Sequence, residues 1–373
     1  MRVVLLGLFA MQALALPTMI RLGYPNCVSC HISPQGGGLL NVYGRGIDQA
    51  QSLAGGEYKP SDNEIARLLS WQGRITQDVR MVGQEVLSTS PGQPVVGVSR
   101  SRFMYRNATE LGGGFRFSAL IMGENIGAPR PSRAYDHALI PGTAMIVSAL
   151  LQYRPAKKNL EFAVGRDALP TGVYVPDLGS YIRSRNRGGY YDNPTQIKMF
   201  WWGKRYQITP FVFGPGGHEA VGERETGGGT LAEFDLLGKQ RTVIGATVLR
   251  ASAAKGERRL MGAYTRLGFG KWGVLAEHDI TDRTFGSTPS FRQQATYVQP
   301  FWALREWLVG SLVGERLTID RPYRESLTAG KVELAMRLRS QMTVTVGFRM
   351  QRNMLTGGWS PAATLQLALK TVN

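Results

Sequence analysis

Alternation of apolar and polar residues dominates the chain from Trp71 to its end. Successive side chains of a β-strand point to opposite faces, so a period of two predicts strands with one apolar and one polar face. Four stretches show the pattern most clearly. Their apolar positions are Phe115, Phe117, Ala119 and Ile121; Ile197, Met199 and Trp201; Val332, Leu334, Met336 and Leu338; and Met342, Val344, Val346, Phe348 and Met350. The sequence therefore predicts β-strands over most of the chain.

Two architectures use such strands: a soluble sandwich that buries the apolar faces, and a transmembrane barrel that turns them toward lipid. Segments of about 10 residues suit a tilted membrane-spanning strand and exceed the usual globular strand. The opposite faces carry long charged side chains, chiefly arginine, as a wet lumen would. At about 20 residues per strand and turn, residues 71–373 predict an all-β fold, a transmembrane antiparallel β-barrel of about 14–16 strands.

Aromatic residues gather near the predicted strand ends, which is typical of the interfacial girdles of membrane barrels. They are Trp201, Trp202, Phe301, Trp302, Trp307 and Trp359. Between Gly165 and Pro215 the alternation is interrupted by a long arginine-rich stretch that includes residues 181–187. Long charged loops are often functional. Three placements are open for this one: inside the lumen, over the pore mouth, or as an ordinary extracellular loop.

The chain is strongly basic, with 44 Lys and Arg against 27 Asp and Glu, a formal net charge of +17 and a pI of about 10.1. The charge is spread along the whole sequence, and no nucleic-acid-binding motif accompanies it, so we expect no nucleic-acid partner. Outer-membrane lipids, lipopolysaccharide phosphates and anionic solutes are partners that such charge suits.

Residues 1–15 are typical of a secretory signal peptide. Arg2 supplies the charged start, an apolar run follows, and Ala13-Leu14-Ala15 has the small-x-small form that a signal peptidase cleaves. The run is shorter than the ~20 residues of a spanning helix, and an uncleaved anchor is the alternative. No later stretch has ~18 consecutive apolar residues, which excludes a helical membrane protein. We therefore expect export to the bacterial outer membrane.

The pentapeptide Cys27-Val28-Ser29-Cys30-His31 holds the two cysteines of the sequence. This C-x-x-C-H spacing is the attachment motif of c-type haem, in which both thiols bond to one porphyrin and the histidine binds its iron. We therefore predict one covalent haem c on Cys27 and Cys30, with His31 as the metal ligand. A redox disulfide would need a βαβ pattern nearby, and a structural zinc site a fourth ligand. A chance match of a short motif is the remaining alternative.

Residues 16–70 form the predicted haem segment, which is too small to cover a haem alone. Arg45 is either a hydrogen-bonding partner of a haem propionate or a solvated surface charge. Residues 61–70 predict a short amphipathic helix, with Ile65, Leu68 and Leu69 at helical spacing. The sixth ligand of the iron is not fixed by the sequence. The candidates considered are Met19, Met81, His137, His218 and His278, with His278 expected in a strand that could face the lumen, and an open sixth position is a further alternative.

A haem motif followed by a barrel-like remainder resembles the fused monohaem cytochrome–porins of the bacterial outer membrane, among them the outer-membrane cytochromes of iron-oxidising bacteria. The likeness covers the whole chain in its order of parts, but only Cys27-Val28-Ser29-Cys30-His31 is specific in sequence. The chain departs from many outer-membrane barrels in ending on Asn373 instead of an aromatic residue. The resemblance implies electron transport through an iron-containing haem, with a periplasmic cytochrome or similar carrier on one side and an extracellular donor or acceptor on the other.

Two other functions remain open, a porin-like channel for anionic solutes and a periplasmic monohaem cytochrome with a β-rich domain. No catalytic His/Arg pair is placed near the motif, so we do not expect an enzyme such as a peroxidase.

Overall fold

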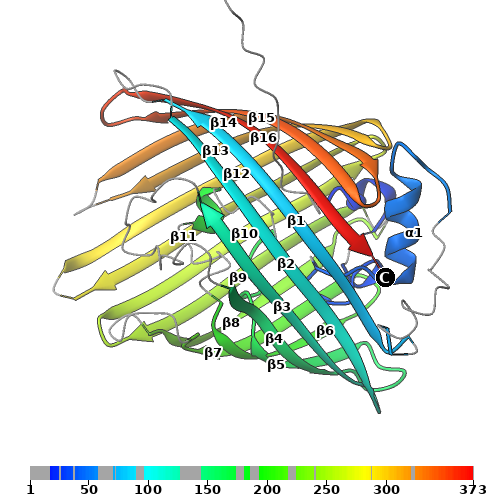
Figure 1. Ribbon diagram of the computed structural model, residues 1–373. Helices are drawn as coiled ribbons and strands as arrows, with labels where there is room; N and C mark the ends of the chain where they lie inside the picture. The colour runs from blue at the N-terminus through cyan, green and yellow to red at the C-terminus, as the bar shows by residue number, and fades with distance from the viewer. Residues whose placement is uncertain are drawn as a thin grey trace, which may run out of the picture.

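The computed structural model describes residues 17–24, 27–36, 38–57, 70–71, 73–89, 96–126, 144–173, 180–184, 193–216, 224–238, 241–286, 288–320 and 324–372. Within these ranges sixteen strands form one closed barrel (Figure 1). Each strand pairs antiparallel with its neighbours in sequence, and β1 closes the ring by pairing with β16. The predicted all-β antiparallel barrel of about 14–16 strands is therefore confirmed.

The elements have the following bounds. The strands are β1 (Ile75–Ser88), β2 (Val96–Gly112), β3 (Phe115–Ile126), β4 (Ala144–Tyr153), β5 (Leu160–Arg166), β6 (Thr195–Trp202), β7 (Tyr206–Gly214), β8 (Thr226–Asp235), β9 (Thr242–Ala253), β10 (Gly256–Phe269), β11 (Trp272–Phe285), β12 (Thr288–Arg305), β13 (Leu308–Ile319), β14 (Glu325–Arg339), β15 (Met342–Asn353) and β16 (Trp359–Val372). The helices are the 3₁₀ helices η1 (Pro17–Leu22) and η2 (Cys27–Ser29) and the α-helices α1 (Val42–Ala50) and α3 (Tyr181–Ser184).

The barrel wall turns its apolar side chains outward. In β14 the side chain of Val332 is 56% exposed, and its neighbour Glu333 is buried inside. In β6 Ile197 is exposed and Lys198 is fully buried. A closed barrel with an outward apolar surface is the arrangement of outer-membrane proteins. The expected outer-membrane localisation follows from it, and the soluble sandwich is the wrong alternative.

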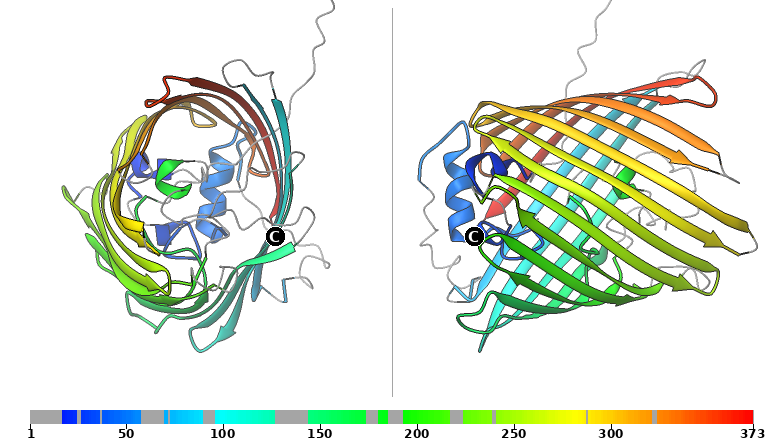
Figure 2. Two further views of the ribbon diagram at one scale, coloured as in Figure 1. Left: turned by 90° about the vertical axis from the view of Figure 1, so that its left-hand side faces the viewer. Right: turned by 180° about the vertical axis from the view of Figure 1, so that it is seen from behind.

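The seven connections from β2–β3 to β14–β15 that lie at one end of the barrel are all short. We call this end the short-turn mouth; β1 begins there and β16 ends there (Figures 1 and 2). Exposed aromatic side chains border it, and Trp201, Trp272 and Phe269 are examples. Trp272 packs on Trp302 with ring centroids 5.7 Å apart. A girdle therefore exists at this end.

Phe301 and Trp202 are exceptions to the predicted girdle. Phe301 is 0% exposed and lies in a cluster of buried apolar side chains inside the barrel. Trp202 packs on another buried cluster, which contains Phe200. Adjacent residues of a strand point to opposite faces, so each faces inward beside an outward tryptophan. The prediction for Phe301 and Trp202 was therefore wrong.

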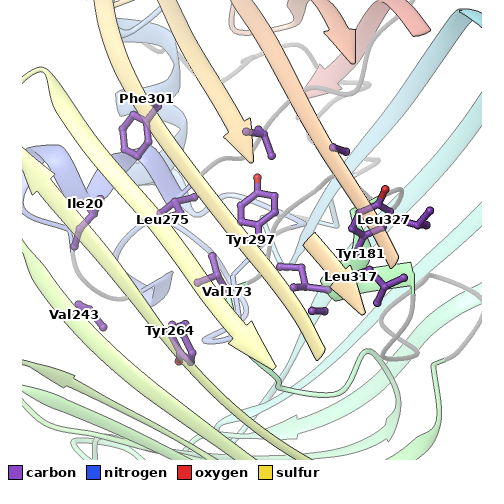
Figure 3. Packing of buried hydrophobic residues seen from close by; sticks show 14 of the residues in the cluster. Ile20, Val173, Tyr181, Val243, Tyr264, Leu275, Tyr297, Phe301, Leu317 and Leu327 are labelled. Atoms are coloured by element: carbon purple, nitrogen blue, oxygen red, sulfur yellow. The ribbon is translucent and has the colours of Figure 1, made fainter. Parts of the chain in front are cut away.

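Apolar residues fill part of the barrel interior, so polar groups do not line all of it. Figure 3 shows Tyr264, Leu275 and Tyr297 of the wall beside Ile20 of η1 and Val173. All belong to one buried cluster that joins the wall to segments inside it. On this side the lumen is a packed core.

The arginine-rich interruption folds into the lumen where the structure describes it, at residues 167–173 and 180–184, which we call the lumen segment. The backbone N–H of Val173 donates to Glu277 Oε2 of β11 at 2.8 Å, and that of Tyr181 donates to Glu315 Oε1 of β13 at 2.7 Å. The end-on view in Figure 2 shows α3 inside the ring of strands. Of the three placements that the sequence left open, these residues therefore adopt the one inside the lumen.

No helix in the described ranges is long and apolar enough to cross a membrane. The predicted signal peptide at residues 1–15 and the predicted helix at residues 61–70, apart from Ser70, lie outside the described residues. The division into residues 1–15, 16–70 and 71–373 stays a prediction.

Candidate functional site at the short-turn mouth

The described residues of the range 17–57, which we call the N-terminal segment, lie in the short-turn mouth, where η1, η2 and α1 meet the ends of the strands (Figure 2). The η1 helix packs on β10, where Gly268 leaves room for the carbonyl oxygen of Ile20. Arg21, which is buried, donates to Glu306 Oε2 in the β12–β13 turn at 2.8 Å and to Gln51 at 3.3 Å. The segment is thus attached to the wall at its amino end.

The other end of the segment is fixed to β14 and β16. Asp48 of α1 forms ion pairs with Lys370 and, at 3.4 Å, with Arg337. The backbone N–H of Leu53 donates to the carbonyl oxygen of Arg337 at 2.8 Å. Together with the contacts of η1, these bonds hold the segment across the mouth.

The predicted haem-attachment motif forms one tight turn. The N–H groups of Cys30 and His31 both donate to the carbonyl oxygen of Cys27, at 3.2 and 2.9 Å. Asn41 ties this turn to α1: its N–H donates to Cys30 O at 2.9 Å, its Nδ2 donates to Ser29 O at 3.1 Å, and its Oδ1 accepts from the N–H of Gly44 at 2.8 Å. Asn41 is therefore both the N-cap of α1 and the link to the motif.

Two glycines allow this close packing. Gly36 has φ +81°, and a Cβ there would lie 2.6 Å from Cys27 Sγ. A Cβ at Gly44 would lie 2.9 Å from the carbonyl carbon and 3.0 Å from the Cα of Cys30. Gly36 and Gly44 therefore leave space for the motif, whereas a Cβ at Gly38 or Gly46 would meet nothing within 4 Å.

The two thiols are not bonded to each other. Burial raises the pKa of the Cys30 thiol, and the neighbouring Cys27 raises it further. Burial also raises the pKa of Cys27, against a smaller lowering by Arg266 of β10. Both groups are therefore held as neutral thiols when no haem is attached.

A cavity opens beside Cys30 and His31, between the N-terminal segment and the first and last strands. Its apolar lining comes from Met19, Leu39, Leu40, Ile47 and Ala368. Its charged lining consists of Arg45, Asp48, Asp78, Arg80, Arg106, Arg337 and Lys370. Cys27 is not among the lining residues and lies instead between Gly36 and Arg266. The cavity thus combines an imidazole and one thiol with an apolar wall and an excess of cations.

Several residues considered as sixth ligand have definite positions. His278 is exposed on the outer face of β11, where its Nδ1 contacts Thr296 Oγ1 at 2.8 Å; the expectation that it could face the lumen was wrong. Met81 is also exposed on the outer face. Met19 lines the cavity together with His31. His137 and His218 lie outside the described residues.

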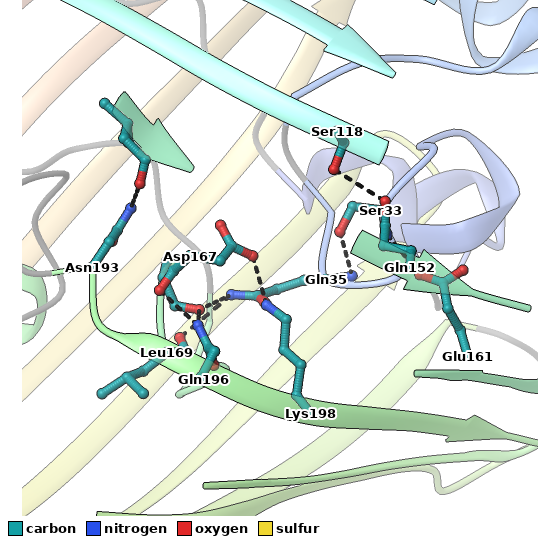
Figure 4. A network of polar contacts seen from close by, with 12 residues as sticks. Ser33, Gln35, Ser118, Gln152, Glu161, Asp167, Leu169, Asn193, Gln196 and Lys198 are labelled. Atoms are coloured by element: carbon teal, nitrogen blue, oxygen red, sulfur yellow. Dashed lines mark hydrogen bonds and ion pairs between the residues drawn. The ribbon is translucent and has the colours of Figure 1, made fainter. Parts of the chain in front are cut away.

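A buried polar network joins the N-terminal segment to the lumen segment (Figure 4). Lys198 Nζ donates at 2.6 Å to both Gln35 Oε1 and Asp167 Oδ2, and its side chain is 0% exposed. Gln35 Nε2 donates to the carbonyl oxygens of Ala168 and Leu169 at 3.2 and 3.4 Å. The alternation of Ile197 and Met199 with Lys198 puts the lysine on the polar face of its strand. It gives no sign of these partners, which come from distant parts of the chain.

The donor set fits a c-type haem in its chemistry. Two thiols and an imidazole lie in one turn, and guanidinium groups beside the cavity suit the two carboxylates of a porphyrin. In the described part of the chain, no group of three or more His, Cys, Asp or Glu side chains is arranged to hold a metal ion by itself.

Comparison with solved structures finds outer-membrane porins. An anion-selective porin from Comamonas acidovorans matches with 11% identity and a TM-score of 0.57, over 80% of this chain and 100% of that one. OprB of Pseudomonas putida matches with 8% identity and a TM-score of 0.62, over 82% and 96%. A loop-deletion mutant of OmpT, an outer-membrane protein of Vibrio cholerae, matches with 8% identity and a TM-score of 0.56, over 80% and 100%.

No protein-family model and no curated protein matches the sequence. At these identities the likeness is one of fold. The chain therefore has the sixteen-strand barrel fold of outer-membrane porins, with an N-terminal segment across one mouth.

Proposed function

We propose that this protein is an outer-membrane electron carrier in which a porin-type barrel holds one covalent haem c at its short-turn mouth. The observation that carries the proposal is the position of the C-x-x-C-H turn, which lies inside that mouth and borders a cavity lined by cationic and apolar groups. Short turns face the periplasm in outer-membrane barrels. The site would therefore be open to a periplasmic redox partner, with an extracellular donor or acceptor at the opposite end.

The residues that would hold the group are Cys27 and Cys30, through thioether bonds, and His31, as a ligand of the iron. A haem bound here would supply an iron that accepts and releases single electrons. Arg45 borders the cavity, and its Nε donates to the carbonyl oxygen of Leu40 at 3.3 Å. This contact holds the guanidinium beside the cavity, which favours its role as a propionate partner over that of a solvated charge.

The charges around the cavity would set the redox potential. Five cationic side chains line it against two carboxylates, Asp48 and Asp78. Positive charge near the iron favours the reduced state and raises its potential. A strongly negative measured potential would contradict this part of the proposal.

Proteoliposomes test the electron-transfer function. Vesicles that enclose an oxidised dye are mixed with a reductant that cannot cross lipid, and dye reduction is followed by absorbance. We expect reduction with the wild-type protein made under cytochrome c maturation and none with the Cys27→Ser/Cys30→Ser double variant. Equal rates for the two proteins would refute the proposal.

A porin-like channel for anionic solutes is the second candidate. The likeness of fold favours this candidate, because one solved structure that matches is an anion-selective porin. Passage of solutes through a channel also needs no cofactor. Buried arginines on the inner wall add to it, although several are paired, as Arg102 is with Glu124 at 2.6 Å. Planar-bilayer conductance with a salt gradient tests this candidate. Anion-selective conductance that is the same in the wild type and in the double cysteine variant would favour it over electron transfer.

A further inference from the structure

We propose that the thioether sulfur of Met19 is the sixth ligand of the iron and completes the ligand set that His31 begins. This inference rests on the proposed haem function and goes beyond it by completing the ligand set. It also predicts a redox property, because methionine with histidine ligation raises the potential of a c-type cytochrome.

The first argument is position. The described residues that line the cavity beside Cys30 include one methionine, Met19, and one histidine, His31. They belong to separate stretches of the segment, η1 and the turn after η2, so the cavity receives a sulfur and a nitrogen donor from two elements. Lys370 also lines the cavity with a nitrogen donor, but its ammonium group is ion-paired with Asp48.

The second argument is that the backbone around Met19 is fixed. The N–H of Tyr24 donates to the carbonyl oxygen of Met19 at 3.3 Å, and the N–H of Gly23 donates to that of Ile20 at 3.1 Å. The next two residues, Ile20 and Arg21, are both buried against the barrel ends. A ligand needs such support, because its side chain must be presented without a large loss of conformational entropy.

The third argument is that other described candidates point elsewhere. The side chains of His278 and Met81 are exposed on the outer face of the barrel. Met104, Met122 and Met145 pack on one another in a separate buried cluster of β2, β3 and β4. None of these five borders the cavity.

The test is the optical spectrum of the purified ferric protein, made in a host competent for cytochrome c maturation. A methionine–histidine haem has a weak sulfur-to-iron charge-transfer band in the red, which bis-histidine and open sites lack. We expect this band in the wild type and in Met81→Ala, the matched control with an outward methionine. We expect Met19→Ala to lose the band and become high-spin, and Met19→His to stay low-spin without it, at a lower potential.

The outcomes separate the two proposals. A red band that persists in Met19→Ala, or that is missing from a haem-loaded wild type, overturns the ligand assignment and leaves the electron-carrier proposal standing. A wild-type protein with no covalent haem overturns both. Haem content is measured for each variant by denaturing-gel staining, so loss of the band is distinguished from loss of the haem.

Discussion

Gly44 and Gly46 form a matched pair for testing how the motif turn is held, because both lie in α1 and only Gly44 faces Cys30. A Cβ at Gly44 would lie 2.9 and 3.0 Å from two backbone carbons of Cys30 and closer still to its carbonyl oxygen, whereas a Cβ at Gly46 would meet nothing within 4 Å. Backbone atoms cannot rotate away as a flexible side chain can. We predict that Gly44→Ala loosens the N-terminal segment and that Gly46→Ala tightens it.

The magnitude follows from two opposing effects. Alanine is favoured over glycine inside a helix by about 0.5–1 kcal/mol, so Gly46→Ala should stabilise α1 by that amount. Gly44→Ala has the same gain, but its overpacking costs about 1–3 kcal/mol. The two variants should therefore differ by about 1–3 kcal/mol, which corresponds to about 5- to 150-fold in the population of the detached segment.

Hydrogen exchange measures that population. The N–H of Asn41 donates to the carbonyl oxygen of Cys30, so it exchanges only when the turn and α1 separate. We expect exchange at Asn41 to be about 5- to 150-fold faster in Gly44→Ala than in Gly46→Ala, with unchanged exchange in the strands. Equal rates in the two variants would refute the packing argument.

Three further predictions concern the lipid face, the buried network and the thiols. Val332→Arg, at the middle of β14, should destabilise the barrel by about 2–4 kcal/mol in a lipid-based unfolding assay, and Phe269→Arg, at the rim, by about 0–1 kcal/mol. Equal costs would contradict the conclusion that the apolar face of the wall meets lipid. Lys198→Met should leave Asp167 and Gln35 without their shared donor and lower the free energy of detaching the N-terminal segment by about 1–3 kcal/mol, after allowing for the partial exposure of Asp167. The segment should then be cut faster by protease. Lys271→Met, at an exposed turn, is the control, and unchanged protease sensitivity in Lys198→Met would exclude the coupling. In haem-free protein, burial raises the pKa of both cysteine thiols. Their neutral form therefore stabilises the fold at pH values below the ordinary thiol pKa of about 8.5, and this contribution is lost as the pH rises through the raised pKa. Alkylation should be slow at neutral pH in the folded protein and fast in urea, and equal rates would show that the thiols are not buried.

The strands and their orientation could be predicted because the period of two is local and repeats. Charged residues must face the interior when the other face meets lipid, and this rule places Glu333 inside and Val332 outside. Applied strictly, the same rule would also have turned His278 outward, between the inward-facing Glu277 and Asp279. It would have turned Phe301 and Trp202 inward, because each is next to an outward tryptophan. These errors came from considering residues singly instead of in register.

The surroundings of the motif could not be predicted, because they depend on closure of the barrel. Pairing of β1 with β16 brings Arg80 and Lys370 to the same cavity from positions 290 residues apart in sequence. The path of the lumen segment depends on bonds to Glu277 and Glu315, which belong to strands far along the chain. A sequence shows that such side chains are polar but gives no sign of which ones meet.

The central claim is tested most directly by mass spectrometry of the protein purified from outer membranes of a host that matures c-type cytochromes. We predict a proteolytic peptide containing Cys27 and Cys30 that carries one haem and has no thiol left to alkylate. A colourless protein in which both thiols can be alkylated after unfolding would contradict the account.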